Sequence, residues 1–162
     1  TGSGCVAVSL AANMDDINII ASDIDSDILE LAKENAELNN VSDRITFAVG
    51  DSFEHLNHYR GKLDCIVSNP PYIAKGDKEN LPVEVRKYEP PHALFAGGDG
   101  LDFIRELAAE SPSYLKENGF LAMEIGHDQG GAVKDLLKKD FYYIELVRDL
   151  SGNDRVVIGY RK

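Results

Sequence analysis

The sequence predicts an α/β fold in which a mostly parallel sheet carries helices on its faces and ends in an antiparallel hairpin. Short apolar runs rich in β-branched residues alternate with longer runs in which apolar residues recur every three or four positions. This alternation is typical of strands joined by crossover helices. Near the C-terminus, two apolar runs are joined by the short turn Leu150-Ser151-Gly152-Asn153, which favours a hairpin at one end of the sheet.

The pattern places each element in order along the chain. Strands are expected at residues 17–22, 44–49, 63–68, 119–125, 141–148 and 155–160, and helices at 4–12, 26–39, 101–115 and 129–139. Between residues 73 and 98 the chain is polar and rich in turn-forming residues, including Pro82, Pro90 and Pro91. This predicts a long connection, and long connections in compact domains are usually functional.

A glycine-rich loop normally follows a strand in a fold of this kind, yet here Thr1-Gly2-Ser3-Gly4 comes first. We therefore expect the first, central strand of the sheet to be missing from this chain.

The composition sets broad limits on function. With 162 residues the chain fits one domain, and no apolar run approaches the roughly 20 residues that a membrane span needs. The net charge of −11 disfavours a large nucleic-acid interface and favours a small cofactor and a neutral or basic protein partner. The two cysteines, Cys5 and Cys65, have no metal-type spacing and are expected to be reduced core thiols.

The first motif is the opening segment, which reads Gly2-Ser3-Gly4-Cys5-Val6-Ala7 and matches G-x-G-x-x-A. Such glycines allow a tight turn and a close approach of backbone to ligand, and the next helix presents free N–H groups. Asp23 follows Gly4 by 19 positions and can accept hydrogen bonds from ribose hydroxyls. Dinucleotides and S-adenosylmethionine both use this pattern, and a helix-opening turn without ligand also remains open. Asp25 competes for the ribose role but is better suited to begin the next helix.

The second motif, Gly50-Asp51-Ser52-Phe53, follows a predicted strand. Asp51 can accept a hydrogen bond from an adenine amino group, and Phe53 can pack near the ring. A solvated turn with a core phenylalanine is the alternative.

The third motif is Asn69-Pro70-Pro71-Tyr72, which directly follows a predicted strand and so lies at the sheet edge where α/β proteins bind ligands. The two prolines fix two φ angles and remove two N–H donors. The segment therefore offers acceptors, the Asn69 side-chain oxygen and the Pro70 carbonyl, which match the two N–H groups of a planar –NH2. Tyr72 can stack on that flat group.

At this point the chain resembles the class I, Rossmann-like amino-methyltransferases, and within them the HemK/PrmC family of peptide-chain release factor glutamine methyltransferases. The resemblance rests on the opening Thr-Gly-Ser-Gly, on Ser68–Ile73 and on four further segments: Glu89–Phe95, Gly98–Leu101, Glu124–Gly126 and Asp149–Val156. It implies that residues 1–162 are the S-adenosylmethionine-dependent catalytic domain, without the family's amino-terminal helical domain that helps to dock the release factor.

The resemblance also implies the site residues, the cofactor, the partner and a cytoplasmic location. S-adenosylmethionine would be bound by Thr1, Gly2, Ser3, Gly4, Asp23, Asp51, Ser52, Phe53 and Asn69. The glutamine amide would be held by Asn69, Pro70, Pro71 and Tyr72, with Asn69, Pro70 and Tyr72 as the catalytic groups. The family often has an aromatic residue where Ser52 stands, so the adenine contact falls to Ser52 or to Phe53.

Three other functions remain as alternatives. An adenine-N6 nucleic-acid methyltransferase uses a similar tetrapeptide, but the acidic charge disfavours it. A nicotinamide oxidoreductase shares the glycine loop but gives Asn69–Tyr72 no role, and a non-catalytic piece would bind nothing. No metal is expected, because the four histidines, His55, His58, His92 and His127, lack a matching set of carboxylate or cysteine ligands.

Overall fold

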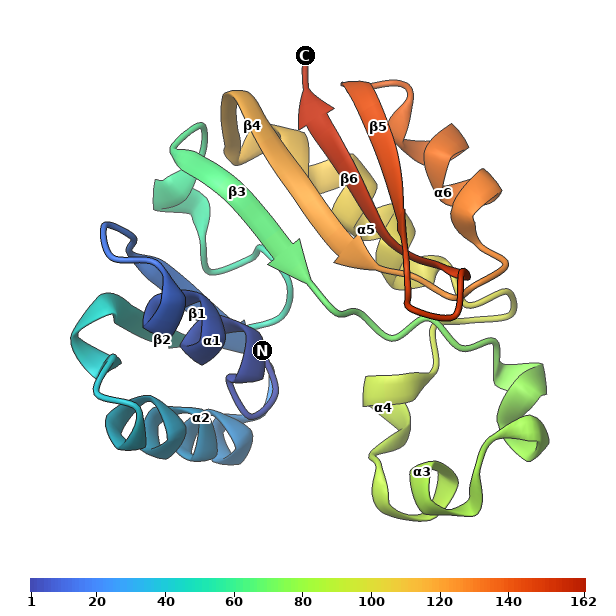
Figure 1. The fold of residues 1–162 in the computed structure, drawn as a ribbon, viewed down its shortest axis with the longest axis horizontal. Helices are drawn as coiled ribbons and strands as arrows, with labels where there is room; N and C mark the ends of the chain where they lie inside the picture. The colour runs from blue at the N-terminus through green and yellow to red at the C-terminus, as the bar shows by residue number, and fades with distance from the viewer. The chain divides into compact units, whose positions relative to one another are not determined.

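The computed structural model describes residues 1–162 and divides into two compact units, Thr1–His58 and Tyr59–Lys162. The first unit contains α1 (Cys5–Asn13), β1 (Ile19–Asp23), α2 (Ser26–Leu38), the 3-10 turn η1 (Ser42–Arg44) and β2 (Ile45–Val49). A further 3-10 turn, η2 (Asn57–Tyr59), lies at the division between the units. Figure 1 shows α1 and α2 close to β1 and β2.

The first unit is built on a parallel pair, in which Ile19 of β1 lies opposite Ile45 of β2 and Asp23 opposite Val49. Its core consists mainly of small and β-branched side chains: Ala7, Val8, Ala11, Ala21, Ala36, Val41 and Ile45. Small side chains let α1, α2 and the strands approach closely. As predicted, Asp25 begins α2, because its carboxylate accepts hydrogen bonds from the N–H groups of Asp27 and Ile28.

The second unit is built on a four-stranded sheet in the order β3-β4-β6-β5. Its strands are β3 (Leu63–Ser68), β4 (Leu115–Glu124), β5 (Phe141–Arg148) and β6 (Asp154–Arg161). β3 runs parallel to β4, whereas β6 is antiparallel to both β4 and β5. The C-terminal antiparallel hairpin predicted from the sequence is therefore confirmed.

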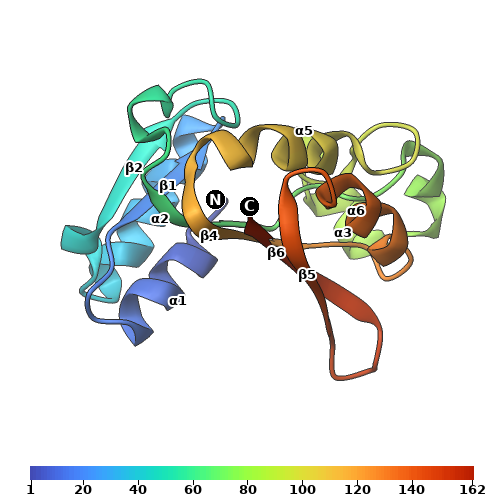
Figure 2. The ribbon, with the colours of Figure 1, turned by 90° about the horizontal axis from the view of Figure 1, so that it is seen from above.

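Two helices, α5 (Asp102–Glu110) and α6 (Gly130–Leu137), lie beside each other over one face of this sheet (Figures 1 and 2). The core between helices and sheet is formed by large apolar side chains that are almost completely buried: Ile104, Leu107, Leu121, Met123, Val133, Leu137, Phe141 and Val157. This packing supports β4 and the residues that directly follow it.

The long connection from residue 73 to 98 differs from the irregular loop expected. It contains the 3-10 helix η3 (Lys75–Asn80) and two short helices, α3 (Val83–Tyr88) and α4 (Pro91–Leu94). The prolines explain the difference, because Pro82 and Pro90 precede these helices and Pro91 opens α4, where a missing N–H costs nothing. The two ends of the connection meet, since Ile73 pairs with Phe95 and donates to the Leu94 carbonyl at 3.0 Å.

Three further expectations are corrected. The helix predicted to reach Leu115 ends at Glu110, followed by the 3-10 turn η4 (Ser111–Ser113), because Pro112 cannot donate to a continuing helix. β4 accordingly begins at Leu115 rather than at Gly119. The cysteines are exposed rather than buried, since Cys5 opens α1 and Cys65 lies on the more exposed face of β3.

No helix is long and apolar enough to cross a membrane.

Candidate active site

The glycine loop of the first unit forms a tight turn, and its Gly2 amide donates to Asp23 at the end of β1. Gly2 and Gly4 both have positive φ angles, of 58° and 77°, and the Gly4 amide donates to the Thr1 carbonyl at 3.1 Å. A Cβ on Gly4 would lie 3.0 Å from the Ala32 side chain, so only glycine lets the start of α1 lie this close to α2. The turn therefore has the close-packed geometry that the motif predicts.

Asp23, at the end of β1, is the acidic residue predicted to accept ribose hydroxyls. Its Oδ2 accepts from the Gly2 amide at 2.8 Å, and its Oδ1 accepts from the Asp25 amide at 3.1 Å. Partial burial opposes ionisation, but these backbone donors favour the carboxylate, and the pKa of Asp23 lies below its usual value. Of the roughly four lone-pair positions of a carboxylate, about two remain for ligand hydroxyls.

The loop after β2 lies at the same end of the first unit, because the Gly50 amide donates to the Asp23 carbonyl at 3.0 Å. Asp51 is exposed, whereas Phe53 is buried with 5% of its surface exposed. Ser52 adopts a positive φ of 43°, and its hydroxyl is buried without a hydrogen-bond partner. Both nitrogens of His55 are likewise buried and unpartnered, and the His55 ring occupies the space that a side chain at Gly50 would need.

These features fit a nucleoside-containing cofactor such as S-adenosylmethionine. The turn leaves open space at Gly2, where an added Cβ would meet no atom within 4 Å. Asp23 is ionised and has acceptor capacity left, and the buried hydroxyl of Ser52 lacks a partner beside the exposed Asp51. Buried polar groups without partners are uncommon in folded proteins and point to a missing ligand or water.

In the second unit, Asn69-Pro70-Pro71-Tyr72 leaves the carboxyl end of β3. The last residue of that strand, Ser68, lies opposite Met123 of β4, so the segment begins from a hydrogen-bonded pair of strands. Asn69 is exposed, Pro70 is buried, and Pro71 and Tyr72 are partly buried. The structure thus places the amide side chain of Asn69 at the surface and fixes the chain immediately after it.

Tyr72 is held at its hydroxyl by residues from two strands. The hydroxyl donates to Glu124 Oε1 at 2.9 Å and accepts from Arg155 Nη1 at 3.3 Å. Arg155 also lies 3.7 Å from Glu124 and, through Nη2, 3.7 Å from Asp149. Burial and the hydrogen bond to Glu124 raise the pKa of Tyr72, so the phenol is neutral at physiological pH.

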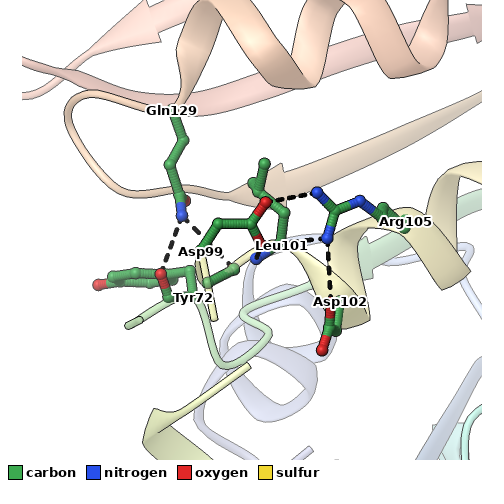
Figure 3. A network of polar contacts seen from close by, with 7 residues as sticks. Tyr72, Asp99, Leu101, Asp102, Arg105 and Gln129 are labelled. Atoms are coloured by element: carbon green, nitrogen blue, oxygen red, sulfur yellow. Dashed lines mark hydrogen bonds and ion pairs between the residues drawn. The ribbon is translucent and has the colours of Figure 1, made fainter. Parts of the chain in front are cut away.

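The main chain of Tyr72 is held from the other side by Gln129. The Gln129 amide nitrogen donates to the Tyr72 carbonyl at 2.9 Å and to the Gly100 carbonyl at 3.4 Å, as Figure 3 shows. The other end of the Gln129 side chain accepts from the Gly126 amide at 2.8 Å. Next to Gly100, Asp99 accepts from the Leu101 amide at 3.1 Å and pairs with Arg105, which also contacts Asp102.

The sequence predicted the candidate site segments but gave no role to the residues that support Tyr72. Glu124, Gly100 and Arg155 lie inside segments on which the family resemblance rests, and that was the available signal. Gln129 was missed as a site residue, because its contact with Tyr72 joins positions 57 residues apart. No group of three or more histidine, cysteine, aspartate or glutamate side chains is arranged to hold a metal ion.

The fold is that of a class I methyltransferase domain, and comparison with known proteins agrees. The methyltransferase from Pyrococcus furiosus has a similar fold, with a TM-score of 0.68 and 19% identity over 99% of this chain and 71% of that one. Residues 1–99 match the model of the methyltransferase small domain family, and the chain belongs to that family.

Comparison with proteins of similar sequence identifies a more specific family within the methyltransferases. The chain is 44% identical, over 161 residues, to a release factor glutamine methyltransferase of Aquifex aeolicus, covering 99% of this chain and 56% of that protein. It is 40% identical over 159 residues to the protein of the same name from Bacillus cereus, covering 97% of this chain and 56% of that protein. The resemblance to the HemK/PrmC family is thereby confirmed, and the chain spans about half the length of these relatives.

Proposed function

We propose that this chain is the catalytic domain of an enzyme that transfers a methyl group from S-adenosylmethionine to the side-chain amide nitrogen of a glutamine in a peptide-chain release factor. The observation that carries the proposal is the Asn69–Tyr72 segment, with an exposed amide at its start and a firmly held tyrosine at its end. The names of the relatives at 40–44% identity support the choice of substrate. A release factor as substrate implies a cytoplasmic location.

Asn69 and Pro70 orient the acceptor in this proposal. A primary amide carries two N–H donors in one plane, and the Asn69 side-chain oxygen and the Pro70 carbonyl supply two acceptors from consecutive residues. Pro70 and Pro71 lack N–H groups, so the segment places no backbone donor next to the acceptor nitrogen. Tyr72, and Pro71 beside it, provide the apolar wall against which the flat amide lies.

The same acceptors favour the transition state. S-adenosylmethionine supplies a sulfonium methyl group that is open to attack by a nitrogen lone pair. An amide nitrogen is a weak nucleophile because its lone pair is delocalised, and it gains positive charge as the new bond forms. Acceptors on its two N–H groups stabilise that charge more than they stabilise the neutral amide. Positioning of the nitrogen towards the sulfonium methyl would supply the remaining rate enhancement. As the N–C bond forms, the S–C bond would break, S-adenosylhomocysteine would leave, and the methylated nitrogen would release one proton to solvent.

Cofactor binding belongs to the first unit in this proposal. The loop Thr1–Gly4, including Ser3, binds the methionine part of the cofactor. Asp23 accepts a hydrogen bond from a ribose hydroxyl, and Asp51 accepts one from the adenine amino group. Ser52 lies beside Asp51 with a buried, unpartnered hydroxyl, whereas Phe53 is buried and supports the loop from within. We therefore assign the polar contact with adenine to Ser52 in preference to Phe53.

The proposal is tested with tritium-labelled S-adenosylmethionine in the complete protein, offered a release factor, a glutamine-containing peptide from it, or DNA. We expect label in the release factor and peptide on a glutamine, and none in DNA. Label in DNA alone would establish the adenine-N6 alternative instead.

Replacing the acceptor side chain gives the first mutational prediction. Asn69→Ala should lower kcat by about 100-fold or more, because an acceptor that acts mainly in the transition state contributes roughly 3 kcal/mol. The dissociation constant of S-adenosylhomocysteine, measured by calorimetry, should change far less. Asn80→Ala is the matched control, because Asn80 is also an exposed asparagine of the second unit and its side chain donates to Asp77 at 3.3 Å. Equal kcat values for the two variants would contradict the role of Asn69.

A further inference from the structure

We propose that Gln129 is a positioning residue of this site, which fixes the path of Asn69–Tyr72 by donating from its side-chain amide to the Tyr72 and Gly100 carbonyls. The inference rests on the proposed function for its catalytic consequence. The contacts themselves lie within the second unit and can be tested separately.

The segment needs an external clamp because of its own composition. Pro70 and Pro71 each fix φ, and Pro71 also restricts the ψ of Pro70 to extended values, but neither proline has an N–H with which to hold the chain. Within that range, the direction of the Pro70 carbonyl depends on where the chain is held on either side. On the upstream side it is held by the pairing of Ser68 with Met123 of β4.

On the downstream side the chain is held at Tyr72. Glu124 and Arg155 bind its hydroxyl, and Gln129 binds its carbonyl, so both ends of the residue are fixed. Glu124 ends β4, and Gln129 follows it by five positions. Most of the upstream and downstream anchors of Asn69–Pro71 thus come from β4 and the turn that follows it, and Arg155 of β6 adds a further one.

Gly100 shows how closely the clamp is packed. It has a φ of 75°, and an added Cβ would lie 2.3 Å from the Tyr72 carbonyl oxygen and 2.9 Å from the Gln129 amide nitrogen. Only glycine allows the 98–101 turn to approach Tyr72 this closely. The Gln129 amide then donates both to the Tyr72 carbonyl, as Figure 3 shows, and to the Gly100 carbonyl.

The orientation of the Gln129 amide is set by a third contact. Because the Gly126 amide donates to Oε1, the NH2 end must face Tyr72 and Gly100, where two acceptors need donors. Gln129 is buried, with 9% of its surface exposed, so water does not readily replace it. A carboxylate here would keep the bond to Gly126 but would set an oxygen against two carbonyl oxygens.

The test uses Gln129→Glu and Gln129→Met in the complete protein. At pH 8 both variants should lose kcat by about 10- to 100-fold, since a displacement of about 1 Å in a reacting group has an effect of this size. The dissociation constant of S-adenosylhomocysteine should stay within about twofold, because no cofactor residue touches Gln129. Burial should favour protonation of the carboxyl introduced by Gln129→Glu at pH 6, and the protonated group can donate to the Tyr72 or Gly100 carbonyl. The ratio of the Gln129→Glu kcat to the wild-type kcat should therefore be about tenfold higher at pH 6 than at pH 8. Gln129→Met should not recover.

Charged groups of both signs lie near this position, and the cations are Arg155, which donates to the Ile125 carbonyl at 3.4 Å, and Arg105, which pairs with Asp99 next to Gly100. Asp128 lies in the same turn, beside Gly126, and Asp154 of β6 lies beside Gly130 at the start of α6. Both are carboxylates, which favour the protonated form of a neighbouring carboxyl. Asp135→Asn, which removes an exposed carboxylate of α6, is the control. Its pH profile of kcat should match that of the wild-type enzyme.

A second measurement does not depend on activity. Hydrogen exchange of the Tyr72, Ile73 and Lys75 amides should accelerate about tenfold or more in both variants, whereas that of the β5–β6 hairpin should not change. Unchanged exchange and unchanged kcat, or a loss in Gln129→Glu that does not depend on pH, would overturn the positioning role. If the wild type methylates no glutamine, the proposed function fails, and the exchange rates still decide whether Gln129 holds the segment.

Discussion

Gly4 begins α1 in a left-handed backbone conformation that side chains rarely adopt, and it does so against the side of α2. Its φ is 77°, and an added Cβ would lie 3.0 Å from the Cβ and 3.3 Å from the Cα of Ala32. Since Ala32 is completely buried, it cannot move away. Strain and crowding therefore act together at the position where the cofactor loop becomes a helix.

Gly4→Ala should accordingly lower the free energy of unfolding by about 2–4 kcal/mol, which combines the strain of positive φ with overpacking. It should also weaken binding of S-adenosylhomocysteine by tenfold or more. Urea unfolding and calorimetry measure the two effects. Gly61→Ala is the control, because Gly61 has a φ of 65° but open space around it. Equal destabilisation by both changes would show that the contact with Ala32 does not matter.

At the scale of single residues, the sequence predicted the positions that short patterns define. Gly4, Asp23 and Asn69 follow from their places in motifs, and Asp25 from its place before a helix. The residues that hold Tyr72 did not follow, because Glu124 and Arg155 are separated from it by 52 and 83 positions. Only the folded sheet brings them together, and no local pattern encodes that contact.

At the scale of elements, strand boundaries were predicted best where turn chemistry is strong. The strand 63–68 ends at Asn69-Pro70, and the strand 141–148 ends before the loop at Asp149, so both agree with the structure. The helices α3 and α4 were missed because they are short and have no apolar periodicity of their own. Their positions instead follow from Pro82 and Pro90, which read equally well as loop residues.

The β5–β6 hairpin depends on the carboxylate of Asp149, which closes its loop. Oδ1 accepts from the amides of Ser151 and Asn153, both at 2.9 Å. The backbone N–H of Asn153 is the main cause that lowers the pKa of Asp149, with the Ser151 N–H and Arg155 acting in the same direction. The folded protein therefore binds this proton less readily than the unfolded chain does.

As pH falls, the Asp149 carboxylate becomes protonated in the unfolded chain before it does so in the folded protein. Its contribution to stability is therefore fully present above the unfolded pKa of about 3.9. That contribution is lost as pH falls through the lower pKa of the folded state. Asp149→Ala should thus have a lower urea midpoint than wild type at pH 7, and the difference should shrink towards pH 3. Asp16→Ala, which removes an exposed carboxylate, serves as control. A difference that stays constant with pH would contradict the role of the charge.

At the scale of the whole molecule, the net charge of −11 follows from the amino-acid composition alone and does not depend on the fold. The chain offers 28 acidic against 17 basic side chains, so a phosphate backbone is repelled at long range. A basic or neutral peptide is not repelled in this way. Under the proposed function, the same charge should disfavour adenine in nucleic acid as the acceptor and should favour basic or neutral glutamine-containing peptides over acidic ones.

This selection can be measured with three peptides that share one glutamine core and carry lysine, serine or glutamate at their flanks. At low salt, kcat/KM should decrease from the lysine to the serine to the glutamate peptide, because attraction by the acidic protein raises the rate of encounter. The three values should converge at about 0.3 M salt, where the screening length falls well below 10 Å. The opposite order would mean that basic side chains near the site, such as Lys75, Lys78, Arg86 and Lys87 of the 73–98 connection, outweigh the net charge of the molecule.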